Sequence, residues 1–164
     1  MISLNFKKVT IEVSINMNLA DEILISGQRD AVYSNLIDPE TLKQCIPGCE
    51  QLVKTSETDF AAVVVLKIGP IKAKFSGKVE LDISSSPEKL SLSGEGDGGV
   101  AGFARGGADV QLINQGDNTL LRYTAKAETG GKIAQLGARL IESTAKKLSK
   151  SFFANFEKIM DGIS

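Results

Sequence analysis

The sequence predicts an α+β domain in which an antiparallel sheet packs against one long C-terminal helix. Three observations predict this class. Segments of alternating polar and apolar residues recur after residue 50, short polar turns separate them, and apolar residues at helical spacing fill the chain after residue 132. At 164 residues, the chain has the size of one domain with a sizeable core.

The first strand is predicted at residues 10–19, where polar and apolar residues alternate. Met17 lies inside this segment and is a second candidate for the start of the chain. Residues 1–16 are therefore interpreted as either an N-terminal strand extension or a misassigned start, and residues 17–164 as one domain.

Two short helices are predicted after this strand, at residues 28–36 and 39–45. Pro39 stands at a helix start, because proline fits the first helical turn. Pro47 and Gly48 end the helical region and lead into the sheet.

Six strands are predicted next. They cover residues 50–56, 58–68, 71–84, 89–96, 102–113 and 119–129. The polar turns at 56–58, 85–88 and 115–118 are too short for helical crossovers, so consecutive strands should pair as an antiparallel meander.

Two of these strands show their faces clearly. Apolar or small residues occupy every second position from Ile71 to Leu81, and charged or polar residues occupy the positions between them. The last strand repeats the pattern, with Leu121, Tyr123 and Ala125 on its apolar face. One face of the sheet is therefore expected to be dry and the other wet.

The last helix is predicted from apolar residues that recur at three- and four-residue spacing and would cover the dry face of the sheet. These residues are Ile133, Leu136, Leu140, Ile141, Leu148, Phe152, Phe156 and Ile159.

Composition excludes several classes of function. Nineteen Lys and Arg residues against 20 Asp and Glu residues give a net charge of −1, so no general attraction to nucleic acid is expected. No stretch approaches the roughly 18 apolar residues of a membrane span, and residues 1–16 lack the features of a secretory signal. Two cysteines without an export signal predict a soluble protein of the reducing cytoplasm.

No catalytic, metal or cofactor site is predicted. The chain contains no histidine, and no serine or cysteine stands in the context of a base. Cys45 and Cys49 are too few for a closed zinc or iron–sulfur site and are interpreted as small buried residues. Gly94, Gly96 and Gly99 match a dinucleotide-binding spacing, but a strand follows them instead of a helix, so we interpret them as a hairpin, a bulge or a close approach to a ligand.

Small residues suggest a cavity where the sheet and the helix meet. Glycine and alanine recur on the apolar strand faces, and Ala134, Gly137 and Ala138 lie opposite them in the predicted helix. A ligand pocket is mostly apolar, as this one would be; the alternative is a filled core in which the helix approaches the sheet closely. The candidate ligand-binding residues are Phe60, Leu66, Ile68, Phe75, Gly77, Gly106, Tyr123, Ala125, Leu136, Gly137 and Leu140.

Two residues of this set carry specific expectations. A buried Tyr123 needs a hydrogen-bond partner, which either a ligand carbonyl or a structural acceptor would supply. A Gly137→Leu substitution is expected to fill the cavity and abolish ligand binding while preserving the fold.

Several spaced motifs resemble the family of the carbon monoxide dehydrogenase G subunit, in order from Met17 to about Met160. They are Asp38-Pro39, Cys45-Ile46-Pro47-Gly48-Cys49, Ile68-Gly69-Pro70-Ile71-Lys72, Phe75-Ser76-Gly77, the glycine-rich segment 94–107, and residues 131–141 and 152–156.

The resemblance implies a START-like helix-grip fold of the SRPBCC superfamily, with a curved antiparallel sheet around the C-terminal helix and a hydrophobic cavity between them. It also implies an accessory protein without a cofactor of its own. Such a protein would bind a quinone or lipid and link a molybdenum hydroxylase of the carbon monoxide dehydrogenase type to membrane electron acceptors.

The sequence ends directly after the predicted helix, without the C-terminal tail of longer family members, so a stable membrane anchor is not expected. Peripheral contact with the inner face of the cytoplasmic membrane would use the lysine-bearing helix or the strand face that carries Lys67, Lys72, Lys74 and Lys78.

Two alternative functions stay open. Related helix-grip proteins include cyclases, and an enzyme acting on an aromatic or polyketide substrate would place Tyr123, Arg105 or Asp109 in the cavity as acid–base groups. Strand alternation instead predicts Arg105 and Asp109 on the outer face. The second alternative is an adaptor that assembles the enzyme without a ligand.

Overall fold

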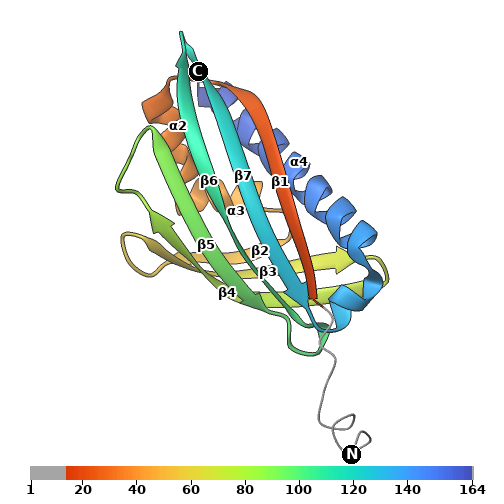
Figure 1. Cartoon of the computed structure of the whole chain (residues 1–164). Coiled ribbons are helices and arrows are strands. Elements are labelled where there is room, and N and C mark those ends of the chain that lie inside the picture. The colour runs from red at the N-terminus through yellow and green to blue at the C-terminus, as the bar shows by residue number, and fades with distance from the viewer. Residues whose placement is uncertain (1–13, 164) are drawn as a thin grey trace, which may run out of the picture.

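Residues 14–163 are described by a computed structural model, and they form one sheet with helices on one of its sides (Figure 1). The sheet has seven strands in the order β1-β7-β6-β5-β4-β3-β2, and every neighbouring pair is antiparallel. Each strand from β2 to β7 pairs with the next along the chain, which confirms the predicted meander. β1 joins the far edge by pairing with β7.

The strands follow the alternating segments of the sequence. Their bounds are β1 Ser14–Ser26, β2 Cys49–Lys54, β3 Asp59–Ile68, β4 Ile71–Asp82, β5 Lys89–Asp97, β6 Phe103–Gln115 and β7 Asn118–Gly130. The predicted first strand, residues 10–19, falls short: β1 continues to Ser26 because it pairs with the whole of β7. Residues 10–13 of that prediction lie outside the described residues.

The two predicted short helices are confirmed as α2 Arg29–Leu36 and α3 Pro39–Cys45. Asp38 caps α3: its carboxylate accepts hydrogen bonds from the Thr41 backbone N–H at 3.3 Å and from the Thr41 hydroxyl at 2.9 Å. Pro39 takes the first helical position, where no N–H is needed.

The C-terminal helix is shorter at its start than predicted. A 3₁₀ helix, η2 Lys132–Leu136, precedes the α-helix α4 Ala138–Ile163. Gly131 and Gly137 on either side of η2 have φ values of +79° and +98°, which break the helical path. Ile133 and Leu136 therefore belong to η2 and not to α4. A second 3₁₀ helix, η1 Gly99–Ala101, joins β5 to β6.

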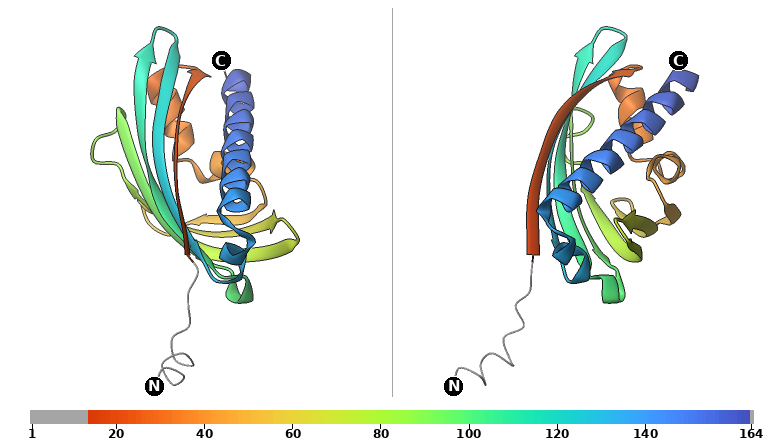
Figure 2. Two further views of the ribbon diagram at one scale, coloured as in Figure 1. Left: turned by 45° about the vertical axis from the view of Figure 1, so that its right-hand side comes forward. Right: turned by 90° about the vertical axis from the view of Figure 1, so that its right-hand side faces the viewer.

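All three α-helices lie on the same side of the curved sheet, and α4 crosses that side diagonally (Figure 2). This side is called the inner face below. Strand alternation places Leu112, Leu121 and Tyr123 on it, and these residues pack in one cluster with Phe156 and Met160 of α4. The predicted division into a dry and a wet face is confirmed: Ala73, Phe75 and Leu81 of β4 are buried, while the intervening lysines are exposed.

The inner face carries two separate hydrophobic clusters. The first, called the packed core, joins α2, α3 and the C-terminal half of α4 to the sheet, and its residues include Ile25, Val32, Leu36, Cys45, Phe60, Leu81, Leu90, Leu112, Leu121, Tyr123, Phe156 and Met160. The second, called the η2 cluster, contains Ile68, Ala73, Phe75, Ala101, Ile133 and Ile141. Along β4 and β7 the two clusters are separated by small residues, such as Gly77 and Ala127.

The turn between β3 and β4 has two residues, Gly69 and Pro70, and contacts the start of α4. Gly69 has a φ of +56°, which a two-residue hairpin turn of this kind requires at its first central position. A Cβ added to Gly69 would lie 2.8 Å from Leu140 Cδ2. Across residues 14–163, no helix combines the length and apolar character that a membrane span needs.

Candidate functional site

The small residues between the two clusters surround an apolar hollow of about 280 Å³ on the inner face. Strand residues from β3 to β7 make up its lining. The lining residues at inner-face positions of these strands are Ala62, Val64, Phe75, Gly77, Val79, Gly94, Gly96, Ala104, Gly106 and Ala127. Protein interiors are normally close-packed, so a hollow of this size in the middle of the face is a feature to explain.

The glycines of this zone have two different structural roles. A Cβ on Gly77 or Gly106 would collide with a carbonyl oxygen of the neighbouring strand, Glu95 and Lys126 respectively. These two glycines therefore let adjacent strands approach closely. Gly96 differs, because a Cβ there would meet Phe75 Cβ at an ordinary 3.6 Å. Gly77 and Gly106 thus serve strand pairing and Gly96 leaves room, whereas none of the three shows the predicted alternative of a helix that approaches the sheet over them.

Three predicted ligand-binding residues line the hollow, namely Phe75, Gly77 and Gly106. Four others pack in or against the η2 cluster beside it. These are Leu66, Ile68, Leu136 and Leu140. Phe60 and Tyr123 belong to the packed core on the other side, and Ala125 packs against that core.

Gly137 was wrongly placed in the cavity. It lies in the turn between η2 and α4, and no atom lies within 4 Å of a Cβ built on it. Its φ of +98° makes any side chain there strained. Gly137→Leu would therefore strain the backbone without filling the hollow, and its effect on ligand binding stays a prediction. Ala134 is buried in η2, and Ala138 is exposed at the start of α4.

A second hollow, a groove of about 680 Å³, runs between β1 and α4. Its lining is partly apolar and partly charged, and it comes from β1, from α4 and from Tyr123 of β7. The lining residues are Asn18, Leu19, Ala20, Asp21, Ile23, Tyr123, Glu142, Lys146, Ser149, Lys150, Phe153, Ala154 and Glu157. β1 is an edge strand of the sheet that residues 14–163 form, and within these residues no further strand covers its free edge.

Tyr123 is 8 % exposed and has a structural hydrogen-bond partner. Its hydroxyl donates to Ser149 Oγ over 3.3 Å. Hydroxyl–hydroxyl hydrogen bonds usually measure about 2.7–2.8 Å, so this bond is a weak one. The Tyr123 ring stacks on Phe153, with centroids 5.3 Å apart and planes inclined by 23°.

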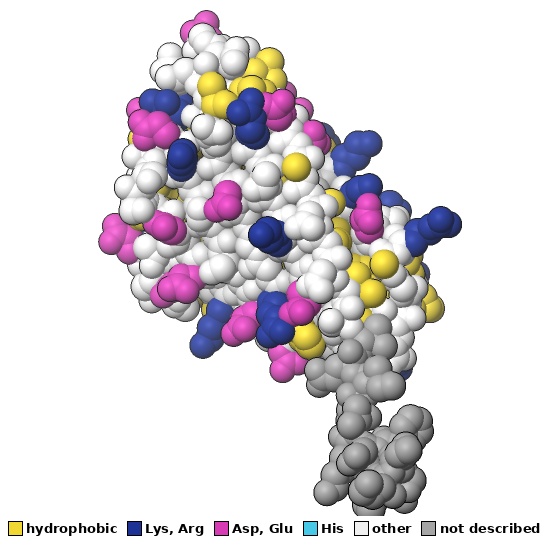
Figure 3. Space-filling model, viewed as in Figure 1, with side chains coloured by type: hydrophobic (Ala, Val, Ile, Leu, Met, Phe, Trp, Pro, Cys, Tyr) yellow, Lys and Arg dark blue, Asp and Glu magenta, His cyan; other side chains and the backbone are white. Residues whose placement is uncertain are grey.

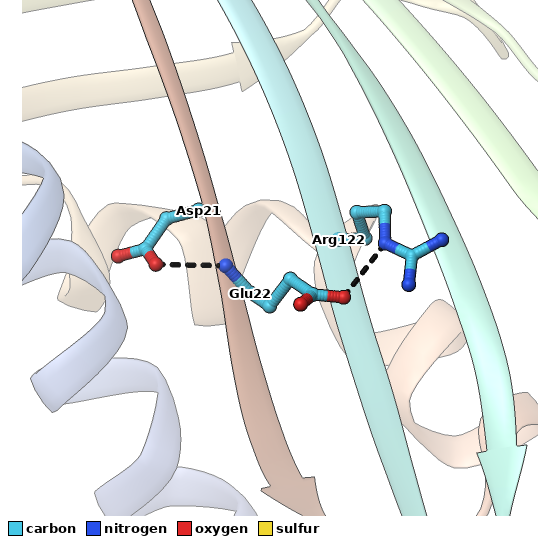
Figure 4. Close-up of polar contacts among 3 residues, drawn as sticks. All are labelled: Asp21, Glu22 and Arg122. Carbon is cyan, nitrogen blue, oxygen red and sulfur yellow. Dashed lines mark hydrogen bonds and ion pairs between the residues drawn. The ribbon is translucent and has the colours of Figure 1, made fainter.

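Asp21 and Glu22 leave β1 in opposite directions (Figure 4). Asp21 lies opposite Tyr123 in the strand register and points toward α4, with its carboxylate accepting the Glu22 backbone N–H at 2.8 Å. Glu22 points over the outer face to Arg122, at 2.7 Å. Asp21 therefore contributes charge to the groove, whereas the Glu22–Arg122 ion pair does not.

Thr129 continues the inner-face row of β7 beyond Tyr123, Ala125 and Ala127. It is 6 % exposed, and its hydroxyl has no hydrogen-bond partner in the described part of the chain. Its register partner Ala104 lines the apolar hollow, as does Ala127. A buried hydroxyl without a partner carries a desolvation cost, so Thr129 is a polar position that packing alone does not account for.

The outer face of the sheet has larger hollows, of about 780 and 550 Å³, over the glycine-rich parts of β4 to β6. Charges of both signs are scattered over this face (Figure 3), and Lys78, Glu95 and Arg105 line both hollows. Their linings are more polar than that of the inner hollow, whereas a ligand pocket is mostly apolar. Volume alone therefore does not identify the site.

Arg105 and Asp109 lie on the outer face, as strand alternation predicted. Arg105 forms an ion pair with Glu128 at 2.5 Å, and Asp109 accepts a hydrogen bond from the Ser91 hydroxyl at 2.6 Å. Both side chains are engaged on the outer face, although Arg105 is among the residues that border the apolar hollow. Of the three residues that a cyclase mechanism would need in the cavity, Tyr123 alone faces a hollow on the inner side.

The two cysteines are free thiols, Cys45 buried and Cys49 half-buried. Burial raises the pKa of both, and for Cys49 this outweighs the opposing effects of Lys43 and of the Gln51 backbone. Both therefore stay protonated near neutral pH, which suits packing and not nucleophilic chemistry. Within residues 14–163, no three His, Cys, Asp or Glu side chains are grouped to hold a metal ion.

Sequence reasoning missed Ser149, Asp21 and Thr129. A signal for Ser149 existed: it sits in the inward-facing series of α4, at four-residue spacing from Ala145 and three before Phe152. Thr129 likewise continues the alternation of the last strand. Asp21 had no comparable signal, because its position depends on how β1 lies beside α4.

Solved structures share this fold. A conserved protein from Geobacillus kaustophilus is 31 % identical with a TM-score of 0.83, and the match covers 89 % of this chain and 96 % of that one. A START superfamily protein from Mycobacterium smegmatis is 11 % identical with a TM-score of 0.69, covering 90 % and 99 % of the two chains. The Zhui aromatase/cyclase from Streptomyces sp. R1128 is 7 % identical with a TM-score of 0.64, covering 89 % and 94 %.

These likenesses confirm the predicted START-like helix-grip fold. No curated protein sequence matches the chain. The sequence profile of the carbon monoxide dehydrogenase G subunit (CoxG) matches residues 22–160, from the middle of β1 almost to the end of α4. The chain therefore belongs to the CoxG family, that of the carbon monoxide dehydrogenase G subunit.

Proposed function

We propose that this protein is a noncatalytic accessory protein that holds a quinone or lipid between the inner face of its sheet and α4. The observation that carries this proposal is the apolar hollow of about 280 Å³ where a packed core would otherwise be expected. Family membership supports a ligand-binding accessory role and suggests the partner, a molybdenum hydroxylase of the carbon monoxide dehydrogenase type.

The mechanism we propose is desolvation and presentation. An apolar chain laid on the small residues of β4 to β7 would leave water and contact Phe75, Val79 and Ala127. Burial of apolar surface contributes about 25 cal/mol per Å², which gives affinity without requiring a specific polar contact. The protein would then carry an electron acceptor between the membrane and its enzyme.

Ligand exchange would occur where the β3–β4 turn meets the start of α4. A Cβ at position 69 would lie 2.8 Å from Leu140 and 4.0 Å from Leu136, and we propose that this contact closes one end of the ligand site. Separation of the turn from α4 would open that end. Glycine at position 69 is required here by both its φ of +56° and its closeness to Leu140.

The same β3–β4 hairpin would supply peripheral contact with the inner face of the cytoplasmic membrane. Lys67 and Lys72 lie opposite each other on its outer face, and Lys78 continues that face of β4. Lys74 is less available, because it lies 3.4 Å from Glu50. A basic face next to the proposed opening would bring that opening to an anionic lipid surface.

A noncatalytic role is favoured over a cyclase by what surrounds Tyr123. Its hydroxyl is hydrogen-bonded to Ser149, and Arg105 and Asp109 are engaged on the opposite side of the sheet. Asp21, the carboxylate opposite Tyr123 in the strand register, accepts the Glu22 backbone N–H, and within residues 14–163 the Tyr123 hydroxyl is hydrogen-bonded to Ser149 and not to a carboxylate that could act as a general base.

The test is native mass spectrometry of the purified protein, followed by solvent extraction and identification of any bound molecule, with added menaquinone and ubiquinone as competitors. A stoichiometric quinone or lipid that either competitor displaces would support the carrier function. An empty protein that binds neither quinone at micromolar concentration would reject it. If such a protein still copurified with the hydroxylase, it would be a ligand-independent adaptor.

A further inference from the structure

We infer that the groove between β1 and α4 binds a neutral, carbonyl-bearing head group through the hydroxyl pair of Tyr123 and Ser149. This inference rests on the proposed carrier function and narrows it: the preferred ligand is a quinone-type amphiphile and not a fatty acid or a phospholipid. Its apolar tail extends from this groove toward the hollow at Ala127.

The hydroxyl pair has hydrogen-bonding capacity to spare. Tyr123 donates to Ser149 over a long 3.3 Å, which leaves the Ser149 hydroxyl proton free to point into the groove. Both side chains line the groove, so a ligand oxygen can reach them. A carbonyl oxygen, which accepts hydrogen bonds and donates none, is the group that complements a free hydroxyl donor.

The surroundings of the pair suit a planar ring. The Tyr123 ring is already stacked on Phe153, and Phe153 meets Phe152 edge-on at 5.1 Å. Leu19 and Ile23 of β1 face the same groove. A flat head group can therefore lie against fixed aromatic and aliphatic walls while its oxygen reaches the hydroxyls.

The charges of the groove exclude an anionic head group. Three carboxylates, Asp21, Glu142 and Glu157, face two ammonium groups, Lys146 and Lys150, a net charge of −1. Lys146 is held by Glu142 at 2.9 Å, which leaves two carboxylates against one lysine. A carboxylate or phosphate placed here would meet net repulsion, whereas a neutral carbonyl would not.

Tyr123 of the groove and Ala127 of the apolar hollow lie on the same strand, β7. Tyr123, Ala125 and Ala127 are successive inner-face positions of that strand. Four residues of strand span about 13 Å. A tail attached to a ring at Tyr123 would run past Ala125, which packs against the packed core, to reach Ala127 and the hollow.

The experiment compares equilibrium binding of three probes, each at pH 7 and with the full chain. The probes are a ubiquinone analogue with a ten-carbon tail, an alkylbenzene with the same tail and no oxygen, and oleate. The variants are Tyr123→Phe, which keeps the ring, and Ser149→Ala, which favours the helix. Tyr33→Phe removes a hydroxyl from α2, away from the groove, and is the matched control.

We expect the quinone to bind wild type and Tyr33→Phe equally, and to bind Tyr123→Phe and Ser149→Ala about fivefold more weakly, since a hydrogen bond contributes about 1 kcal/mol. Alkylbenzene binding should not change, and oleate should bind wild type more weakly than the quinone. Equal quinone affinity for wild type and both groove variants, or preferred binding of oleate, would overturn the head-group assignment alone. A wild type that binds none of the probes would overturn the carrier function itself.

Discussion

Two regions of the inner face differ in how they are covered. Under the C-terminal half of α4, Phe156 and Met160 are fully buried against Ile25, Leu112 and Leu121, which are large side chains. Toward the middle of the sheet, glycines and alanines take the place of large side chains, and an apolar hollow of about 280 Å³ is lined by strand residues. The same sheet face therefore carries both a close-packed core and a hollow.

This difference suggests that different parts of the inner face serve stability and ligand binding, namely the packed core and the apolar hollow. Burial of large side chains at the packed core stabilises the fold, and this leaves the middle of the sheet free to remain open. Substitutions at the two places should therefore have opposite consequences: removal of atoms harms the packed core, whereas addition of atoms harms the hollow.

The largest effect is expected for Phe156→Ala. Phe156 is 0 % exposed, so its truncation should lower the free energy of unfolding by about 3–5 kcal/mol. The matched comparison is Phe153→Ala, one turn earlier on the wall of the groove. It should lower the free energy of unfolding by about half as much, because Phe153 is only half-buried. Urea denaturation followed by circular dichroism measures both. Equal losses would mean that the wall of the groove is packed as closely as the packed core.

An intermediate effect is expected for Ala62→Leu, which adds atoms to the hollow. Quinone affinity should fall at least about tenfold, while the free energy of unfolding changes by about 1 kcal/mol or less because space is available. Ala61→Leu puts the same side chain on the outer face of the same strand and should leave affinity unchanged. If Ala61→Leu weakened binding as much as Ala62→Leu, the ligand would not occupy the inner face.

The smallest effect is expected for Thr129→Val. The change keeps the shape and removes a buried hydroxyl that lacks a partner, so the free energy of unfolding should rise by about 1 kcal/mol. Thr124→Val, on the exposed face of the same strand, serves as the control and should have little effect. A loss of stability in Thr129→Val would show that its hydroxyl is hydrogen-bonded in solution, for instance to a bound water.

Much of the fold follows from sequence pattern. Alternation from Ile71 to Leu81 predicted the inner and outer faces of β4, and short polar turns predicted the meander. The start of α4 was mispredicted because Ile133 and Leu136 keep helical spacing, although Gly131 and Gly137 interrupt the backbone around them. Periodicity reports which side chains are apolar, and it does not report a change of backbone path.

The candidate site was predictable only in part. Phe75, Gly77 and Gly106 were placed correctly beside a hollow, since strand alternation fixes their face. The sequence pattern could not distinguish glycines that leave room for a ligand from glycines that let neighbouring strands approach each other. The role of each glycine depends on the twist and curvature of the sheet. The pairing of Tyr123 with Ser149 depends on how α4 crosses the sheet, which no local signal fixes.

The most direct test of a ligand between the sheet and α4 is the fluorescence of Tyr123 during a quinone titration. The chain has two tyrosines and no tryptophan, so Tyr33→Phe leaves Tyr123 as its one strong emitter, and Tyr123→Phe leaves Tyr33. At a quinone concentration that saturates both variants, we expect Tyr123 emission to be quenched with one-to-one stoichiometry and Tyr33 emission to change little. Equal quenching of both tyrosines, or none of either, would contradict a ligand held between the inner face and α4.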